Sequence, residues 1–253
     1  MVHKAVAWAA DGDQERAEWW GGRLGIPAVP LFDLKGSGVD FALVARDGGI
    51  ELDWLKKPEM SALRFEFESG PLRQRMRSLG KSNPLVKSLG DFKAGETIWD
   101  ISFGQGLDSL LFLKLGMRVI AYERNPFIFA LAEDGIGRAR ASNALNEFID
   151  WDLIELRLGD ALPEMNVRTA PEYIYFDPMF ADKSKALPRK EMQFFSALVG
   201  NDADAFQVLE RARKFAAKRT VVKRSNSADA LSLGVTHAFT GKLVRYDMYL
   251  PSK

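Results

Sequence analysis

The chain has 253 residues, 47% of them hydrophobic and 27% charged, and its formal net charge at pH 7 is +1. This composition excludes disorder as the main state, because so many apolar side chains can bury a core. The lack of Cys and the presence of only His3 and His237 exclude disulfides, thiolate catalysis and Cys- or His-based metal sites. The apolar stretches are too short to span a membrane, so we expect a soluble cytoplasmic protein.

Residues 1–93 are expected to form a small α+β extension at the N-terminus. Hydrophobic patterning and turn residues predict a strand over Val2–Ala9, a helix over Gln14–Leu24, and a hairpin of Phe41–Arg46 with Ile50–Trp54. Leu63, Phe65 and Phe67 then alternate with charged neighbours, which predicts an exposed strand. A basic segment follows this strand and leads into the second part of the chain.

Residues 94–253 alternate between strands and helices. In chain order the expected elements are strand Thr97–Ile101, helix Leu107–Leu115, strand Arg118–Tyr122, helix Pro126–Asn143, strands Ile154–Leu158 and Tyr173–Phe176, helix Asp204–Ala217, strand Thr220–Lys223, and a hairpin of Val235–Phe239 with Leu243–Leu250. This pattern predicts a doubly wound α/β fold, with a mostly parallel sheet, helices on both faces and one antiparallel edge strand. Such sheets bind ligands at the carboxyl ends of their strands.

A glycine-rich turn follows the first of these strands, in the sequence DISFGQGLDS. Asp100 ends the strand, and Gly104 and Gly106 allow the backbone to approach a ligand at the N-terminus of the next helix. Alone, this pattern is also typical of an ordinary strand-to-helix turn. Because the third glycine of a dinucleotide fingerprint is replaced by Ser109, a nucleoside ligand without a pyrophosphate is favoured.

Acidic residues follow the next two strands. Glu123 can accept hydrogen bonds from both hydroxyls of a ribose, or it can be an exposed residue at a strand end. Asp160, which follows Gly159, can accept from the exocyclic amine of adenine, can cap the following helix, or can do both.

The fourth strand is followed by Asp177-Pro178-Met179-Phe180. Asp177 and the Pro178 carbonyl can accept hydrogen bonds from a planar amine, while Phe180 stacks on the ring that carries the amine. The alternative is a type I turn, which Asp-Pro often begins. Together with the three preceding sites, the pattern predicts a binding site for S-adenosylmethionine (AdoMet) beside an amine acceptor.

The chain resembles the RsmJ family of bacterial 16S rRNA guanine-N2 methyltransferases from about residue 41 to its end. The segments that carry this resemblance are DISFGQGLDS, VIAYERNPFIFALAEDGIGRA, YIYFDPMF, KEMQFFSALVGNDADA and KRTVVKR. The resemblance implies a Rossmann-like class I methyltransferase fold with a seven-stranded sheet, AdoMet as donor, and a guanine N2 amine of 16S rRNA as acceptor. By position, the AdoMet contacts of the family fall on Leu107, Asp108, Glu123, Arg124, Gly159, Asp160 and Asp177.

Two basic runs are candidates for phosphate contacts with 16S rRNA or the 30S subunit. The first comprises Arg73, Arg75, Arg77 and Lys81, and the second Lys183, Lys185, Arg189 and Lys190. A solvated charged face is the alternative for each run. Two other functions stay open: methylation of a different RNA, a small molecule or a protein amine, and a non-catalytic module that binds AdoMet or RNA.

Overall fold

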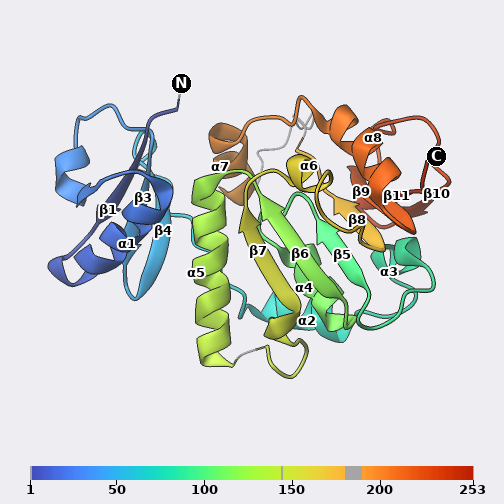
Figure 1. Ribbon diagram of the computed structural model, residues 1–253. Helices are drawn as coiled ribbons and strands as arrows, with labels where there is room; N and C mark the ends of the chain where they lie inside the picture. The colour runs from blue at the N-terminus through green and yellow to red at the C-terminus, as the bar shows by residue number, and fades with distance from the viewer. Residues whose placement is uncertain (1, 144, 180–189, 253) are drawn as a thin grey trace. The chain divides into compact units, whose positions relative to one another are not determined.

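The protein is described by a computed structural model that covers residues 2–143, 145–179 and 190–252 (Figure 1). It divides into two compact units whose sequences interleave. The small-sheet unit comprises Met1–Phe67, Asn125–Ser142 and Ala181–Gly200, and the large-sheet unit comprises Glu68–Arg124, Asn143–Phe180 and Asn201–Lys253. The sequence predicts a single boundary, between residues 93 and 94. The structure differs from this expectation, because the chain returns twice to the small-sheet unit after leaving it.

The large-sheet unit contains seven strands in the order β10-β11-β9-β8-β5-β6-β7 (Figure 1). The strands are β5 (Thr97–Asp100), β6 (Arg118–Glu123), β7 (Ile154–Leu158), β8 (Tyr173–Phe176), β9 (Arg219–Ser225), β10 (His237–Thr240) and β11 (Val244–Tyr249). Neighbouring strands from β9 to β7 pair in parallel, whereas β11 is antiparallel to β9 and to the edge strand β10. The doubly wound α/β fold expected from the sequence is thereby confirmed.

Helices cover the two faces of this large sheet. They are α2 (Gly70–Arg77), α3 (Pro84–Leu89), α4 (Leu107–Lys114), α6 (Ala161–Glu164) and α8 (Ala205–Phe215), with a 3-10 turn, η3 (Trp151–Leu153). On one face, Trp99 of β5 and Phe176 of β8 belong to a buried cluster with Leu209 of α8. On the other face, Tyr175 of β8 meets Phe112 of α4 edge-on, with ring centroids 5.1 Å apart. Alternation along the strands therefore assigns Trp99 and Phe176 to the α8 face and Tyr175 to the α4 face.

The small-sheet unit contains a four-stranded sheet in the order β2-β1-β3-β4. Its elements are β1 (Lys4–Trp8), η1 (Asp11–Asp13), α1 (Gln14–Leu24), β2 (Ala28–Pro30), η2 (Leu31–Leu34), β3 (Phe41–Arg46), β4 (Gly49–Trp54), α5 (Pro126–Ser142) and α7 (Lys190–Leu198). The predicted hairpin of β3 and β4 is confirmed. Its tight turn uses positive φ angles at Asp47 (49°) and Gly48 (73°), as a two-residue hairpin requires.

Residues 63–67 do not form the exposed strand that their alternation predicts. Leu63, Phe65 and Phe67 are 1%, 3% and 2% exposed, and Leu63 makes only an isolated bridge to Leu52. The Phe65 ring lies parallel to that of Phe195 on α7, with centroids 6.2 Å apart. The alternation correctly separates an apolar face from a polar one, but it does not reveal that helices from later in the chain cover the apolar face.

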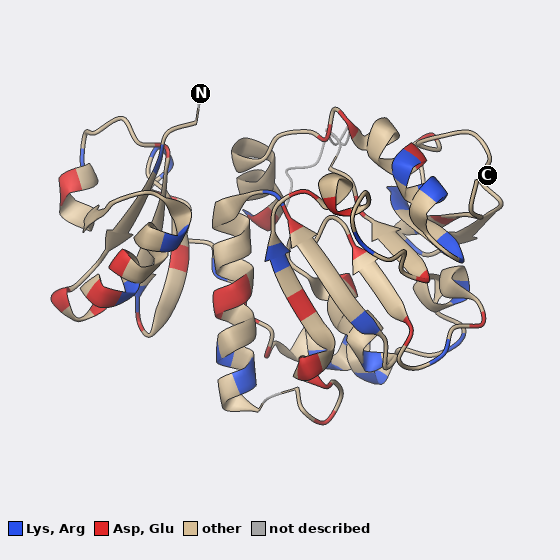
Figure 2. Ribbon diagram, viewed as in Figure 1, with Lys and Arg blue, Asp and Glu red and all other residues tan. Residues whose placement is uncertain are grey.

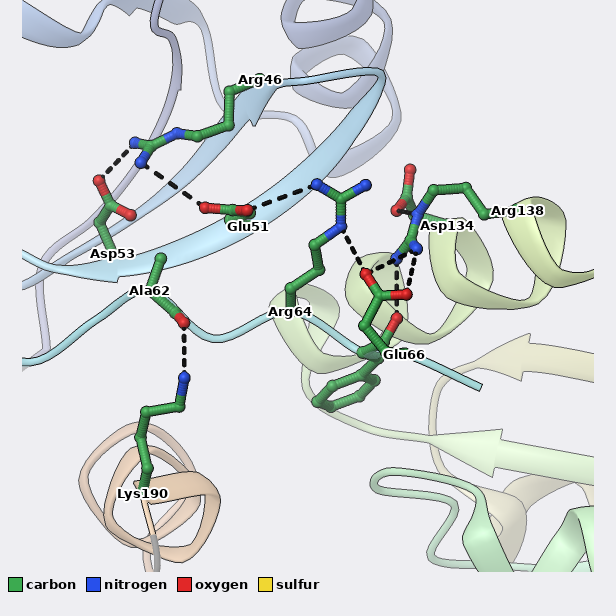
Figure 3. A network of polar contacts seen from close by, with 10 residues as sticks. Arg46, Glu51, Asp53, Ala62, Arg64, Glu66, Asp134, Arg138 and Lys190 are labelled. Carbon is green, nitrogen blue, oxygen red and sulfur yellow. Dashed lines mark hydrogen bonds and ion pairs between the residues drawn. The ribbon is translucent and has the colours of Figure 1, made fainter. Parts of the chain in front are cut away.

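The polar face of the same segment is held by a network of charges (Figure 3). Arg138 of α5 donates to both oxygens of Glu66 at 2.9 Å and to the Phe65 carbonyl at 2.7 Å. Lys190, the first residue of α7, donates to the Ala62 carbonyl at 2.9 Å. The network is completed by Arg46, Glu51, Asp53, Arg64 and Asp134. It joins α5, α7 and β4 through one extended segment.

Within the described parts of the chain, no helix is both long and apolar enough to cross a membrane.

Candidate active site

The glycine-rich turn lies between β5 and α4 and depends on glycine at two positions. Gly104 and Gly106 have φ angles of 55° and 70°, where a side chain is strained. A Cβ atom at Gly106 would also lie 2.1 Å from the Phe103 ring. The turn packs so closely that only glycine fits at residue 106, and it brings backbone N–H groups to the start of α4, where Leu107 is the first helical residue.

Glu123 ends β6 and lies against this turn. It is 8% exposed, and its Oε2 accepts from the Gly104 N–H at 2.9 Å. The carbonyl of Glu123 accepts from the Gly159 N–H at 2.8 Å, across the ends of β6 and β7. The structure therefore brings together the residues that sequence reasoning placed after the first three strands.

Asp160 caps helix α6, as one of its two sequence interpretations predicts. Its Oδ1 accepts from the Leu162 N–H at 2.9 Å. Its other oxygen, Oδ2, lies 3.7 Å from Arg124 Nε. Arg124 also reaches Asp204 at 3.1 Å and Asp202 at 3.7 Å. A single guanidinium thus joins the ends of β6 and β7 to the segment that precedes α8.

Asp177 and Pro178 begin the turn after β8, and both flanks of the turn are anchored. The Asp177 N–H donates to Ser102 Oγ, next to the glycine-rich turn, at 2.7 Å. The Met179 N–H donates to Asp202 Oδ2 at 2.7 Å, and the Asp202 N–H donates back to the Met179 carbonyl at 3.0 Å. Phe180, the candidate stacking residue, lies outside the described residues.

The two aspartates on either side of the glycine-rich turn have pKa values shifted in opposite directions. Asp100 is 2% exposed, and burial raises its pKa to about 7 although Ser109 and Ser102 donate hydrogen bonds to it. Burial also disfavours the charged form of Asp108, but the cations of Lys223 and Arg75 outweigh burial and lower the Asp108 pKa to about 2. Asp108 is therefore ionised at neutral pH, whereas Asp100 titrates near it.

The basic residues of α2 are placed differently from one another. Arg75 donates to Asp108 Oδ1 at 2.5 Å, so its guanidinium lies in the candidate cofactor site. Arg73 and Arg77 lie 2.8 Å and 3.9 Å from Glu147, and the Arg77 side chain is 60% exposed. Lys81 is exposed. Arg73, Arg77 and Lys81 are therefore the residues of this run whose guanidinium or ammonium groups lie outside the candidate cofactor site.

The second basic run cannot be placed as a whole. Lys183, Lys185 and Arg189 lie outside the described residues. Lys190 lies in the small-sheet unit, where its ammonium is bonded to the Ala62 carbonyl and to Ser61 Oγ. The basic residues of α8 share this helix with one acidic residue, Glu210, which pairs with Arg213 at 2.9 Å (Figure 2), in agreement with a solvated surface.

Three polar residues of the site were not found by sequence reasoning. Lys223 of β9 lies between Asp108 and Asp177, Tyr175 of β8 donates to Asp108 Oδ2 at 2.5 Å, and Asp202 anchors Met179. They belong to the segments KRTVVKR, YIYF and GNDADA, but nothing in one sequence shows that the side chains of these segments meet.

The residues present fit a bound AdoMet. The acidic group of Glu123 lies at the end of β6, where a ribose is bound in sheets of this kind, and it contacts the glycine-rich turn through the Gly104 N–H. The other candidate contacts follow the carboxyl ends of the neighbouring strands β5, β6 and β7. They are Asp108, Arg124, Gly159 and Asp160. Among the described residues, no group of three or more His, Cys, Asp or Glu is arranged to hold a metal ion.

Comparison with known proteins adds sequence relatives and a solved structure. Residues 32–251 match the family described as "Putative SAM-dependent methyltransferase". A ribosomal RNA small subunit methyltransferase J from Bdellovibrio bacteriovorus is 37% identical over 202 residues, which cover 78% of this chain and 77% of the relative. The enzyme of the same name from Pseudomonas syringae pv. syringae is 35% identical over 95% of this chain and 88% of its own.

The crystal structure of a SAM-dependent methyltransferase from Neisseria gonorrhoeae superimposes with a TM-score of 0.74 at 26% sequence identity. The match covers 98% of this chain and 96% of the other. The similarity therefore includes the small-sheet unit as well as the large sheet.

Proposed function

The chain belongs to the family of SAM-dependent methyltransferases, and we propose that it methylates the exocyclic N2 amine of a guanine in 16S rRNA. It is an enzyme that takes AdoMet as its methyl donor. AdoMet supplies a methyl group that its sulfonium already activates. The work of the protein is to hold the donor, to align the acceptor nitrogen behind the methyl group and to exclude water.

The observation that carries this proposal is the position of Asp177 beside the glycine-rich turn. Its backbone is bonded to Ser102, and its side chain is 40% exposed. The acceptor nitrogen becomes positively charged as it bonds to the methyl group, so a carboxylate that accepts its hydrogen bond stabilises the transition state more than the ground state. The Pro178 carbonyl is proposed to accept the second hydrogen of the amine, and Phe180 to stack on the base.

Recognition of rRNA is proposed to use the exposed cations near α2. Arg77 and Lys81 offer charge for phosphate contacts, and Arg73 lies one helical turn from Arg77. Lys183, Lys185 and Arg189, which come after the Asp177-Pro178 turn in the sequence, are proposed to contact phosphates, and so is Lys190 at the start of α7. An acceptor in the small ribosomal subunit would be met in the cytoplasm.

Methyl transfer from labelled AdoMet tests the proposal with three acceptors: 16S rRNA freed of protein, 30S subunits, and no RNA. We expect label in 16S rRNA or in 30S subunits, recovered as N2-methylguanosine after digestion to nucleosides. If the label is transferred instead to a different RNA, a small molecule or a protein, the proposed 16S rRNA acceptor is wrong. If AdoMet binds but its methyl group is transferred to none of these acceptors, the protein is a non-catalytic module that binds AdoMet or RNA.

A further inference from the structure

The ammonium group of Lys223 lies between two carboxylates of the candidate active site. Its Nζ is 2.8 Å from Asp177 Oδ2 and 3.0 Å from Asp108 Oδ2. Lys223 belongs to β9, which pairs in parallel with β8 up to Phe176 and Val222, so Asp177 and Lys223 follow the last pair side by side. The Lys223 side chain is 25% exposed and the Asp108 side chain 7%. The contact is thus fixed by the register of two central strands.

This contact leaves one oxygen of Asp177 for another partner. Lys223 binds Oδ2, and the backbone of Asp177 is anchored separately by Ser102. No described residue forms a hydrogen bond with Asp177 Oδ1. Because the side chain is 40% exposed, an amine that approaches the turn can reach this oxygen while Lys223 fixes the plane of the carboxylate.

The other charged groups around Asp177 do not replace Lys223. Asp108 of α4 is a second anion, and its oxygens already accept from Arg75 of α2 and Tyr175 of β8. The remaining groups that face the cluster are Asp100 of β5, Tyr246 of β11 and Asp202. Burial raises the pKa of Asp177. The attraction of the Lys223 ammonium is the largest interaction that opposes this rise. The Lys223 pKa itself is raised, because Asp108 and Asp177 outweigh its burial.

We propose that Lys223 is a positioning residue for methyl transfer, which keeps the Asp177 carboxylate ionised and turned so that Oδ1 faces the acceptor amine. The proposal rests on the proposed function of Asp177. In that reaction the nitrogen–methyl bond forms as the methyl–sulfur bond breaks, and the pair of electrons of the broken bond stays on sulfur. The proton that nitrogen loses passes to the Asp177 carboxylate and from there to water, which requires the carboxylate to start in its ionised form.

A titration of Asp177 tests the electrostatic part without any RNA. Protein labelled with 13C in the aspartate carboxyl carbons is titrated by NMR, and the Asp177 signal is identified by its loss in Asp177→Asn. In the wild type we expect Asp177 to be ionised at pH 7. In Lys223→Met its pKa should rise by about 1 unit or more, because an adjacent cation lowers a carboxyl pKa by about 1–3 units. Lys223→Arg should restore the wild-type value, and Lys214→Met, at an exposed position on α8, should not change it.

Kinetics test the positioning part. With 16S rRNA as acceptor, Lys223→Met should lower kcat at least about 10-fold. The acidic limb of the kcat–pH profile should also move to higher pH, by the same amount as the Asp177 pKa in the NMR titration. AdoMet affinity is measured in the same variant and kcat is taken at saturating AdoMet, because Lys223 also contacts Asp108. Lys223→Arg should recover most of kcat, and Lys214→Met should behave as the wild type.

The outcomes separate this inference from the proposed function. An unchanged Asp177 pKa and unchanged kcat in Lys223→Met would overturn the role of Lys223, and so would an Asp177 that is protonated at pH 7 in the wild type. Lys223→Gln takes the place of Lys223→Met should the latter not fold, and the wild-type titration decides the matter if neither folds. A wild-type protein that does not methylate 16S rRNA, but in which the Asp177 titration depends on Lys223, would contradict the proposed acceptor alone.

Discussion

Asp177 is the residue on which the proposed chemistry depends most directly. We expect Asp177→Asn to fold normally, because the side chain is 40% exposed at a strand end. Methyl transfer to 16S rRNA should fall by ~10²–10³, the usual loss when one preorganised polar contact to developing charge is removed. AdoMet affinity is measured in the same variant, to separate donor binding from the chemical step. A wild-type rate would assign Asp-Pro to the turn alone.

Glu123 combines two roles that two substitutions can separate. Its carboxylate accepts from the Gly104 N–H and is proposed to bind the ribose of AdoMet. Glu123→Gln keeps an oxygen for Gly104 but loses the charge, whereas Glu123→Ala loses both. We expect calorimetry to show AdoMet binding weakened by about 1–3 kcal/mol in Glu123→Ala and by less in Glu123→Gln. Equal affinity in all three proteins would remove the ribose assignment.

At the scale of elements, two glycines of α5 should respond oppositely to the same change. A Cβ atom at Gly135 would lie 2.8 Å from the Phe65 carbonyl, whereas at Gly137 it would meet nothing within 4 Å. Gly135→Ala should therefore destabilise the protein by about 1–3 kcal/mol, as overpacking does. Gly137→Ala should stabilise it by about 0.5–1 kcal/mol, because alanine favours the helix. Urea unfolding measures both, and a stabilising Gly135→Ala would contradict the packing of residues 63–67 on α5.

Helix α2 offers a comparison between basic residues of one run. The double variant Arg77→Ala/Lys81→Ala should bind RNA more weakly whatever the RNA sequence. A plot of the logarithm of the binding constant against the logarithm of the salt concentration should be less steep by about 2, since each phosphate that is no longer neutralised reduces the slope by about 1. AdoMet affinity should not change in this variant. Arg75→Ala should instead weaken AdoMet binding, because Arg75 is bonded to Asp108. Filter binding across a salt series checks the first expectation, and an unchanged slope would make this run a solvated face.

The elements that sequence patterns predict well are those whose patterns are local. The helix Gln14–Leu24, the β3–β4 hairpin and the strands that end at Asp100, Glu123 and Phe176 follow from apolar runs and turn residues. The short helices α2 and α3 were not predicted, because each spans only about two turns or fewer and α2 begins with Gly70-Pro71 in a basic, weakly apolar stretch.

The other features that the sequence did not predict depend on contacts between segments that are far apart along the chain. That Lys223 lies beside Asp177 follows from the pairing of β9 with β8, and that Asp202 anchors Met179 follows from the path of the chain before α8. Both depend on segments that are far apart in the sequence and meet only in the folded protein, which local patterns do not contain. The burial of Phe65 likewise depends on α7, which lies far along the chain.

For the whole molecule, the interleaving of the two units limits how the chain can be divided. The small-sheet unit receives α5 directly after Arg124, and the segment that contains α7 after the turn that begins with Asp177. The chain therefore passes between the units next to two parts of the proposed site. We infer that the proposed site and the small-sheet unit cannot be separated by cutting the chain once.

The pH dependence of folding tests the buried electrostatics of the whole protein. Asp100 has a pKa of about 7 in the folded protein and near 4 in an unfolded chain. Between these values the folded state binds one proton more than the unfolded state. The stability that this proton contributes is fully present below about pH 4 and is lost as the pH rises through 7, by roughly 4 kcal/mol. Asp108 acts oppositely, and its contribution is lost only as the pH falls from about 4 to 2.

Replacement of Asp100 by asparagine should therefore flatten the decline of stability between pH 5 and pH 8. Asparagine keeps an acceptor oxygen for Ser102 but has no proton to lose, so the variant should lose less stability than the wild type over this range. Urea midpoints by circular dichroism, measured at both pH values without AdoMet, give the comparison. Asp91→Asn, at an exposed aspartate of the same unit, should show the wild-type pH dependence. A pH dependence in Asp100→Asn as steep as that of the wild type would show that Asp100 is ionised in the folded protein well below pH 7.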